Sequence, residues 1–284
     1  MTPHERAVQL ALRSNAALKT ITNQMGTTEA PRGRVLSAYR QARRALVAVR
    51  NVGELRQVLN ELRLTLEIIA RQTLDTATQY GLQQATAELA AWDIAGPPSA
   101  YNWQAALAAW LAVIDAQLTK VQTLYIIGDG DVSPILGDTS RVGVLAPAPV
   151  INEGAQWAAV ALAGAWLASV TNALRGIGQE SAYQRQAVAA IDERTTDCCL
   201  RVHGQVVELR ERFHTPGTPH FAERQLDPPF HWYCRTTVCL VRREFADDAL
   251  SVQMRDAAQS ELHARAQTGQ RTTIHPAHAT SQRP

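Results

Sequence analysis

The sequence has few cysteines, almost no lysine and no large excess of charge of either sign. Its 284 residues include four cysteines, too few for a fold held together by disulfides. The formal net charge is +2, which argues against a protein built mainly to coat nucleic acid. Only Lys19 and Lys120 are lysines among the 28 cationic residues. With 46% hydrophobic residues, the chain has enough apolar side chains for a folded core.

Several functional motifs are also missing. The first 20 residues contain charged side chains and no apolar run, so no secretory signal is expected. The chain has no phosphate-binding P-loop, no dinucleotide-binding glycine motif and no serine nucleophile elbow. Residues 154–174 carry no charge and are long enough to cross a membrane, but their alanines and interspersed polar residues favour a buried helix. These absences argue against the corresponding enzyme classes and against a membrane protein.

Hydrophobic periodicity predicts long helices in the first part of the chain. Apolar residues recur at helical spacing over residues 35–49, and a second apolar stripe runs over residues 55–92. Asn51 and Glu54 have the spacing of a helix-capping pair at the start of the second helix. A Gly-Pro-Pro sequence breaks this helix, and another is predicted over residues 103–126.

The pattern changes after the helices, and short β-prone segments replace the helical period. Residues 187–191, 205–209 and 235–241 are such segments, with turn signals between them. The predicted fold class is mostly α, with long N-terminal helices followed by a small α+β C-terminal module that contains a short antiparallel sheet. The predicted divisions are a helical N-terminal region (1–127), a linker (128–150), the α+β module (151–245), a C-terminal helix (246–267) and a disordered tail (268–284).

All four cysteines lie between residues 198 and 239. Cys199 and His203 are four residues apart, so one helical turn would point both side chains the same way. His231 and Cys234 follow as a His-x2-Cys pair. Thiolate and imidazole are the ligands that zinc prefers, so these four residues predict one zinc ion that staples the module. A disulfide between Cys199 and Cys234, or simple packing of buried thiols, is the alternative. The other two cysteines have no clear partner and are expected to be structural.

Two sequence blocks frame these candidate ligands. The first is Asp192-Glu193-Arg194-Thr195 with Cys199, His203 and Gly204, and the second is Pro228-Pro229 with His231, Cys234 and Arg235. Together, over about residues 180–245, they resemble the phage Mu-type head-morphogenesis, or minor head protein, family. The resemblance covers about a quarter of the chain. Thr196 and Thr236 stand where many members of that family have a further cysteine, which favours a mixed Cys/His site.

The resemblance implies a structural protein rather than an enzyme. Members of this family are minor components of the phage head, associated with the portal or the procapsid interior, that act in head assembly, DNA packaging or ejection. It therefore implies a place in the virion, and in the host cytoplasm during assembly. The implied partners are the portal protein, capsid or scaffold proteins and packaged DNA, and no role for a membrane is expected. Structural rather than catalytic roles are implied for Asp192, Glu193, Arg194, Thr195, Gly204, Pro229 and Arg235.

A basic segment in the N-terminal region fits such a role. Residues 32–50 contain six arginines and no acidic residue. Arg40, Arg43 and Arg44 would share one helical face, away from the apolar stripe. This face is a candidate for contact with DNA phosphates or with an acidic partner surface. A solvated helix face is the simpler alternative.

The second functional hypothesis is a metal-dependent nuclease or another hydrolase. His203 would act as the general base, and Asp192 would orient the attacking water or bind a divalent ion. This hypothesis ranks second because four protein ligands would close the coordination position that a catalytic zinc ion needs.

Overall fold

A computed structural model of the chain describes residues 1–21, 31–96, 99–127, 131–132, 145–193, 195–216, 224–231 and 234–269. These residues form seven α-helices and a small antiparallel sheet in the C-terminal part, which confirms the predicted fold class. The chain divides into two compact units. Unit 1 contains Met1–Lys19, Thr76–Asn102 and Ala158–Pro284, and unit 2 contains Thr20–Asp75 and Trp103–Trp157.

Unit 2 is built from helices. It contains α2 (Pro31–Leu46), the first part of α3 (Val52–Ala91), α4 (Gln104–Tyr125), the short hairpin of β1 (Ile126–Ile127) and β2 (Asp131–Val132), and the start of α5 (Ala148–Gly176). The predicted cap of α3 is present. The Asn51 side chain accepts a hydrogen bond from the Glu54 backbone N–H at 2.9 Å, and the Glu54 carboxylate accepts one from the Arg50 N–H at 2.7 Å. This pairing satisfies backbone donors that have no partner inside the helix.

Close packing in unit 2 centres on Trp110 of α4. Its indole N–H donates to the Val150 carbonyl of α5 at 2.9 Å, so the buried ring has its polar atom satisfied. Gly154 lies against the same ring, and a Cβ at this position would lie 2.2 Å from a ring carbon. A glycine is therefore required where α5 meets the tryptophan.

Unit 1 contains a three-stranded antiparallel sheet with the order β4-β3-β7. Its strands are β4 (Val206–Glu208), β3 (Tyr183–Ala189) and β7 (Thr236–Arg242), and they confirm the three β-prone segments with shifts of a few residues. The central strand β3 pairs with β7 over its whole length, from Tyr183 opposite Arg242 to Ala189 opposite Thr236. A second, two-stranded pairing joins β5 (Phe213–His214) to β6 (Arg224–Gln225).

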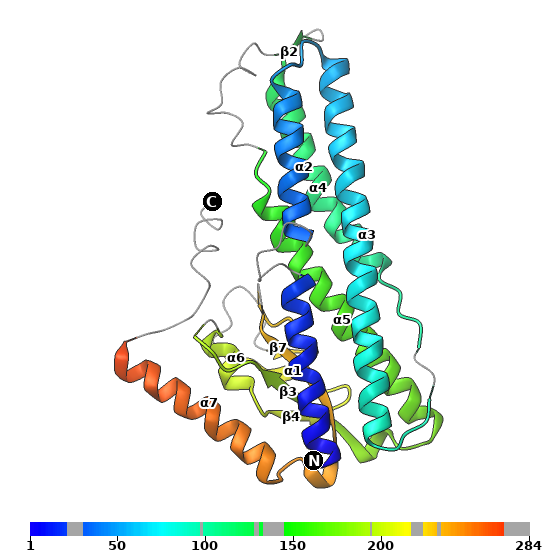
Figure 1. Cartoon of the computed structure of the whole chain (residues 1–284), viewed down its shortest axis with the longest axis vertical. Helices are drawn as coiled ribbons and strands as arrows, with labels where there is room; N and C mark the ends of the chain where they lie inside the picture. Colours follow the sequence, from blue (N-terminus) through cyan, green and yellow to red (C-terminus); the bar gives the residue numbers. More distant parts are fainter. Residues whose placement is uncertain are drawn as a thin grey trace. The chain divides into compact units, whose positions relative to one another are not determined.

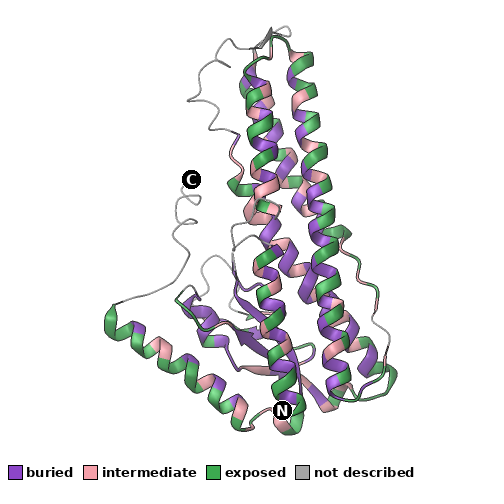
Figure 2. Ribbon diagram, viewed as in Figure 1, coloured by how far each residue is buried: buried purple, intermediate pink, exposed green. Residues whose placement is uncertain are grey.

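Both faces of this sheet are covered, as the buried strands in Figure 2 show. Successive residues of a strand point to opposite faces. Ala187 and Leu240 pack with apolar residues of α3 and α5, including Trp92 and Trp166. Val188 and Cys239 face the other way and pack with residues of α1 (Pro3–Ile21) and α7 (Ala249–Thr268). Burial on both faces explains why residues 238–241 of β7 are all apolar. In β3, the buried Arg185 and Gln186 instead donate hydrogen bonds to Leu226 and Ser251.

Helix α1 is attached to the sheet by a buried histidine. The His4 ring contacts the Gln186 side chain of β3 at 2.7 Å and the Asp248 carboxylate at 2.8 Å. Asp248 is also the N-cap of α7, because its side chain accepts from the Ser251 N–H at 2.8 Å. One histidine thus links α1, the sheet and the start of α7, which lie next to one another in Figure 1.

The two units do not follow the predicted domain boundaries. Residues 1–19 and 76–102, expected in a helical N-terminal region, belong to the unit that contains the sheet, and the predicted C-terminal helix belongs there too. The reason is tertiary: helices distant in sequence cover the two faces of the sheet. Most of the predicted linker 128–150 and almost all of the predicted tail lie outside the described residues.

Helix α5 contains the uncharged segment noted in the sequence. Its length and a mean hydropathy of 1.4 in its most apolar window would suffice to cross a membrane, but 61% of that window is buried within the structure. Such burial is typical of the core helix of a folded unit.

A buried carboxyl group joins the helices to the sheet in unit 1. Glu88 of α3 accepts hydrogen bonds from the Gln84 side chain (2.6 Å), the Trp166 indole N–H (3.1 Å) and the Leu240 backbone N–H (2.8 Å). Burial raises the pKa of Glu88 to about 8, against the lowering effect of these donors. The group therefore keeps its proton in the folded protein at pH values where it ionises in the unfolded chain.

We expect Glu88→Gln to flatten the pH dependence of stability. Because the folded pKa is raised, the stabilising proton is fully in place below about pH 4.5, and its contribution is lost as the pH rises to about 8. The free energy of unfolding should fall over this window by up to about 1.4 kcal/mol per pH unit in the wild type. Denaturant unfolding at several pH values measures the slope, and equal slopes in both proteins would contradict the prediction.

Candidate metal centre

The described residues bring three metal-ligating side chains together in unit 1. Cys198 and Cys199 lie on the short helix α6 (Asp197–Val202), and His231 follows the Pro228–Pro229 segment. Their ligand atoms all lie within 4.8 Å of one another, and all three residues are buried. This group can hold a metal ion.

Cys234, three residues after His231 in the chain, also lies next to the group. The Cys199 Sγ lies 2.8 Å from the His231 Nε2 and 3.6 Å from the Cys234 Sγ. A turn places the last two residues, because the Cys234 N–H donates to the His231 carbonyl at 3.1 Å. The four cysteines are free in the structure.

Thr196 lines the same group from the start of α6. Its hydroxyl oxygen lies 2.8 Å from the His231 Nε2 and 3.1 Å from the Cys198 Sγ. The threonine hydroxyl thus contacts two of the candidate ligands. Its hydroxyl is available to orient the imidazole ring.

Electrostatics in the group are strongly coupled. A hydrogen bond with Cys199, together with burial, raises the pKa of Cys198 to about 12. Burial alone would lower the pKa of His231, but the neighbouring thiolates outweigh it and raise the pKa well above its ordinary value. Burial would raise the pKa of Cys234, and hydrogen bonds from Cys199 and the backbone lower it instead. The raised pKa of Cys198 favours its neutral thiol, whereas the lowered pKa of Cys234 favours a thiolate. A bound metal cation would deprotonate the thiols that ligate it.

The sequence prediction of the ligands is corrected at one position. Cys199, His231 and Cys234 are together as expected, but His203 is not part of the group. The backbone N–H of Ala189, at the end of β3, donates to the His203 Nδ1 at 2.9 Å and holds the ring at the sheet. Cys198, which was expected to be structural, takes its place beside the other ligands. The adjacent Cys-Cys pair was the available signal for it.

An ion pair joins the two chain segments that carry the ligands. The Arg235 guanidinium binds both carboxylate oxygens of Asp192, one of them at 2.5 Å. Arg235 is buried, and its carbonyl accepts from the Ala190 N–H at 3.0 Å. Thr195 closes the turn after Asp192, because its N–H donates to the Asp192 carbonyl at 3.0 Å. These contacts position α6 against the start of β7.

Helix α7 supplies a further contact that the sequence did not indicate. The buried Arg265 donates to the carbonyls of Thr195 (2.6 Å) and Asp192 (2.9 Å), and it pairs with the Asp197 carboxylate at 3.1 Å. The predicted independent C-terminal helix therefore holds the loop that leads into α6.

The remaining motif residues have varied positions. Gly204 has φ +76, and a Cβ there would lie 2.9 Å from the Arg255 Cγ, so glycine is needed at this turn. Pro229 is buried and follows a cis peptide bond. Glu193 is exposed, and Arg194 lies outside the described residues.

The predicted basic face lies on α2 in unit 2. Arg40 and Arg44 are exposed, and Arg43 is half-buried and donates to the Leu145 carbonyl at 2.6 Å. Two of the three arginines are therefore presented to solvent, and the third also serves packing within the unit.

The nuclease hypothesis requires His203 and Asp192 to act together. His203 lines a surface pocket of which Asp192 is not a lining residue, and the Asp192 carboxylate is bound by Arg235.

Comparisons of the chain with family models, with curated proteins and with solved structures find no match. Its function is therefore inferred from the geometry and from the motif resemblance.

We expect the purified chain to carry about one metal ion, which Cys199→Ser removes. Cys199 is the residue that contacts both His231 and Cys234, so its loss leaves no complete ligand set. Metal content measured by inductively coupled plasma mass spectrometry tests this. Cys239→Ala is the matched control, because Cys239 is equally buried but packs against α1. Equal metal content in both variants would refute the site.

Replacing Arg265 with Met should loosen α7 and the loop before α6. The variant leaves two carbonyls and a buried carboxylate without their donor, which costs about 3 kcal/mol. Limited proteolysis and denaturant unfolding report the effect. Arg243→Met removes an exposed ion pair with Glu208 and should have a much smaller effect. Equal effects of the two substitutions would show that Arg265 is not an anchor.

Proposed function

We propose that this chain is a minor head protein of a phage, which acts in head morphogenesis at the portal or in the procapsid interior. One observation carries the proposal. The two blocks that resemble the family, residues 192–204 and 228–235, contact each other residue by residue in the structure: Asp192 with Arg235, and Cys199 with His231 and Cys234. A chance likeness between two separate segments gives no reason for their matching residues to meet. A structural core shared with the family would explain why these residues are in contact.

The burial and the contacts of the motif residues favour a structural role over catalysis. The candidate ligands are buried, and the Asp192–Arg235 pair serves to join two segments. The ligand atoms of Cys198, Cys199 and His231 lie within 4.8 Å of one another, and Cys234, 3.6 Å from Cys199, would add the fourth protein ligand of a tetrahedral ion. Such a closed site stabilises a fold and leaves no position for a substrate or an activated water.

Zinc is the ion that we propose for this group. Ligand atoms at about 2.0–2.3 Å from a tetrahedral ion lie roughly 3.4–3.8 Å apart. The Cys199 and Cys234 sulfurs, at 3.6 Å, fit this spacing, whereas the Cys199 sulfur and the His231 Nε2, at 2.8 Å, would move apart to hold the ion. Three thiolates with one imidazole suit zinc. The bound ion would neutralise the thiolates and hold α6 to the segment before β7.

The helical unit 2 would then supply contact surface. The exposed Arg40 and Arg44 of α2 are suited to an acidic face of the portal or a capsid or scaffold protein, or to phosphates of packaged DNA. The exposed apolar residues Leu64 and Ile68, one turn apart on α3, lie in the same unit.

The test is quantitative mass spectrometry of purified particles and procapsids from the host that produces this chain. We expect a few copies per portal ring, far below the major capsid protein. Particles assembled with Cys199→Ser should lose the chain or contain it in reduced amount, whereas Cys239→Ala should be incorporated normally. Absence of the wild-type chain from particles at every stage of assembly would refute the proposal.

A further inference from the structure

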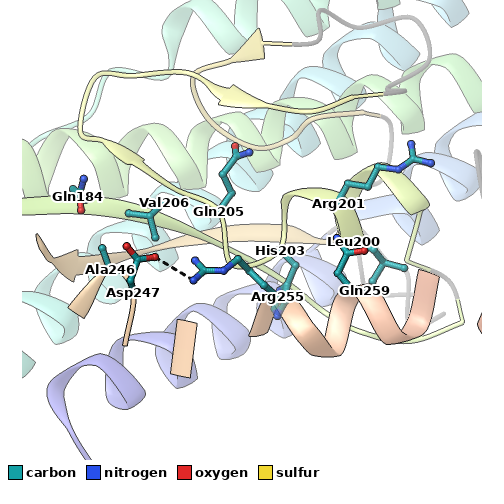
Figure 3. Close-up of a pocket in the computed structure, with 10 residues that line it drawn as sticks. All are labelled: Gln184, Leu200, Arg201, His203, Gln205, Val206, Ala246, Asp247, Arg255 and Gln259. Carbon is teal, nitrogen blue, oxygen red and sulfur yellow. Dashed lines mark hydrogen bonds and ion pairs between the residues drawn. The ribbon is translucent and has the colours of Figure 1, made fainter. Parts of the chain in front are cut away.

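A pocket lies beside the candidate metal centre but does not include its ligands. It has a volume of about 410 Å³ and is lined from α6, β3, β4 and α7 (Figure 3). None of the motif contacts described above explains this hollow. Its size is within the range of pockets that bind small molecules.

His203 offers a hydrogen-bond donor to the pocket. Its Nδ1 accepts from the Ala189 backbone N–H, and an N–H can only donate, so Nδ1 carries no proton. Burial lowers the pKa of His203 to about 4, so the ring is neutral near pH 7 and its proton is on Nε2. His203 is only 7% exposed, and no described residue hydrogen-bonds the Nε2. The fold therefore fixes one tautomer and leaves its donor without a partner.

Two arginines line the same pocket. Arg255 of α7 reaches Asp247 at 3.1 Å, as the dashed line in Figure 3 shows, and Arg201 of α6 donates to the Pro216 carbonyl at 3.2 Å. Asp247 is the one acidic residue among the described lining residues, and its side chain is 89% exposed. The lining thus has an excess of one positive charge, and a ligand can replace Asp247 as the partner of Arg255.

Gln184 of β3 provides an acceptor in the pocket. Its side-chain nitrogen donates to Glu208 at 2.9 Å, while its Oε1 is buried without a hydrogen-bond partner among the described residues. A buried acceptor without a donor is costly, and this oxygen is closed to solvent. A rotation of the Gln184 side chain toward the pocket would let a ligand hydroxyl donate to it. The pocket therefore combines donors for an anion with an acceptor for a hydroxyl group.

We propose that this pocket binds a small phosphate monoester that also carries hydroxyl groups, of the sugar phosphate or nucleoside monophosphate class. The phosphate accepts from His203 and Arg255, with Arg201 at the rim, and a hydroxyl donates to Gln184. A dianionic phosphate matches two arginines and an N–H donor better than a singly charged carboxylate does. The recessed, nearly buried His203 favours a small ligand over the backbone of a long nucleic acid.

The test is isothermal titration calorimetry of the full-length chain with ribose 5-phosphate and adenosine 5′-monophosphate. We expect binding of at least one of them, weakened about 10- to 100-fold by Arg255→Gln, which removes a charge-assisted hydrogen bond. Asp247→Asn should tighten binding, because the exposed carboxylate no longer competes for Arg255. This second variant removes no buried contact, so misfolding cannot explain its result.

Arg210→Gln is the matched control. Arg210 belongs to the same unit, is 70% exposed and lies outside the pocket, so its loss should leave binding unchanged. Equal weakening by Arg210→Gln and Arg255→Gln would reduce the binding to general charge attraction and overturn the proposal. The proposal would also be overturned if acetate bound as tightly as the phosphate monoesters, or if a DNA oligonucleotide bound and neither phosphate monoester did. None of these outcomes bears on the head role, since the pocket shares no ligand with the metal centre.

Discussion

The ion pair between Asp192 and Arg235 joins the two chain segments on which the candidate metal centre is built. Asp192 precedes α6 with its cysteines, and Arg235 directly follows the His-x2-Cys turn. Binding both carboxylate oxygens fixes the orientation as well as the distance of the two segments. Arg265 then holds the backbone of the same loop from α7. The positions of Cys199, His231 and Cys234 depend on this frame before any metal is considered.

The ion pair of Asp192 with Arg235 and the contacts of Arg265 explain why charge is concentrated in a largely buried region. Arg185, Arg235 and Arg265 are all buried, and each binds a carboxylate: those of Asp227, Asp192 and Asp197, respectively. Arg185 and Arg265 also donate to backbone carbonyls. Arginine suits such places because its planar guanidinium serves several acceptors at once. The pairs of Arg185 with Asp227 and of Arg265 with Asp197 are strongly unfavourable to break, because the remaining partner is left buried and uncompensated. The sheet region of unit 1 therefore tolerates few changes in these residues, whereas exposed pairs such as that of Arg243 and Glu208 can change freely.

Local sequence signals predicted the helices, the strands and most of the cluster. The Asn51–Glu54 cap and the β-prone segments were readable because they depend on neighbours in the chain. His203 was misassigned because spacing of four residues describes a continuous helix, whereas α6 ends at Val202 and a backbone N–H of β3 takes the ring. The domain boundaries were missed for a related reason. Which helices cover a sheet is decided by contacts such as His4 with Asp248, 244 residues apart, and no local pattern encodes them. The role in phage heads stays a prediction.

The arrangement of unit 1 has a consequence for synthesis of the chain. Helix α1 leaves the ribosome well before β7, because Thr237, which donates a hydrogen bond to the Ala11 carbonyl, follows 226 residues later. At translation rates of about 5–20 residues per second, the nascent helix waits on the order of ten seconds or more for that strand. All segments of unit 2 precede residue 158, so they are synthesised before β7. The side of α1 that packs on β7 therefore stays without this partner until the strand has been synthesised.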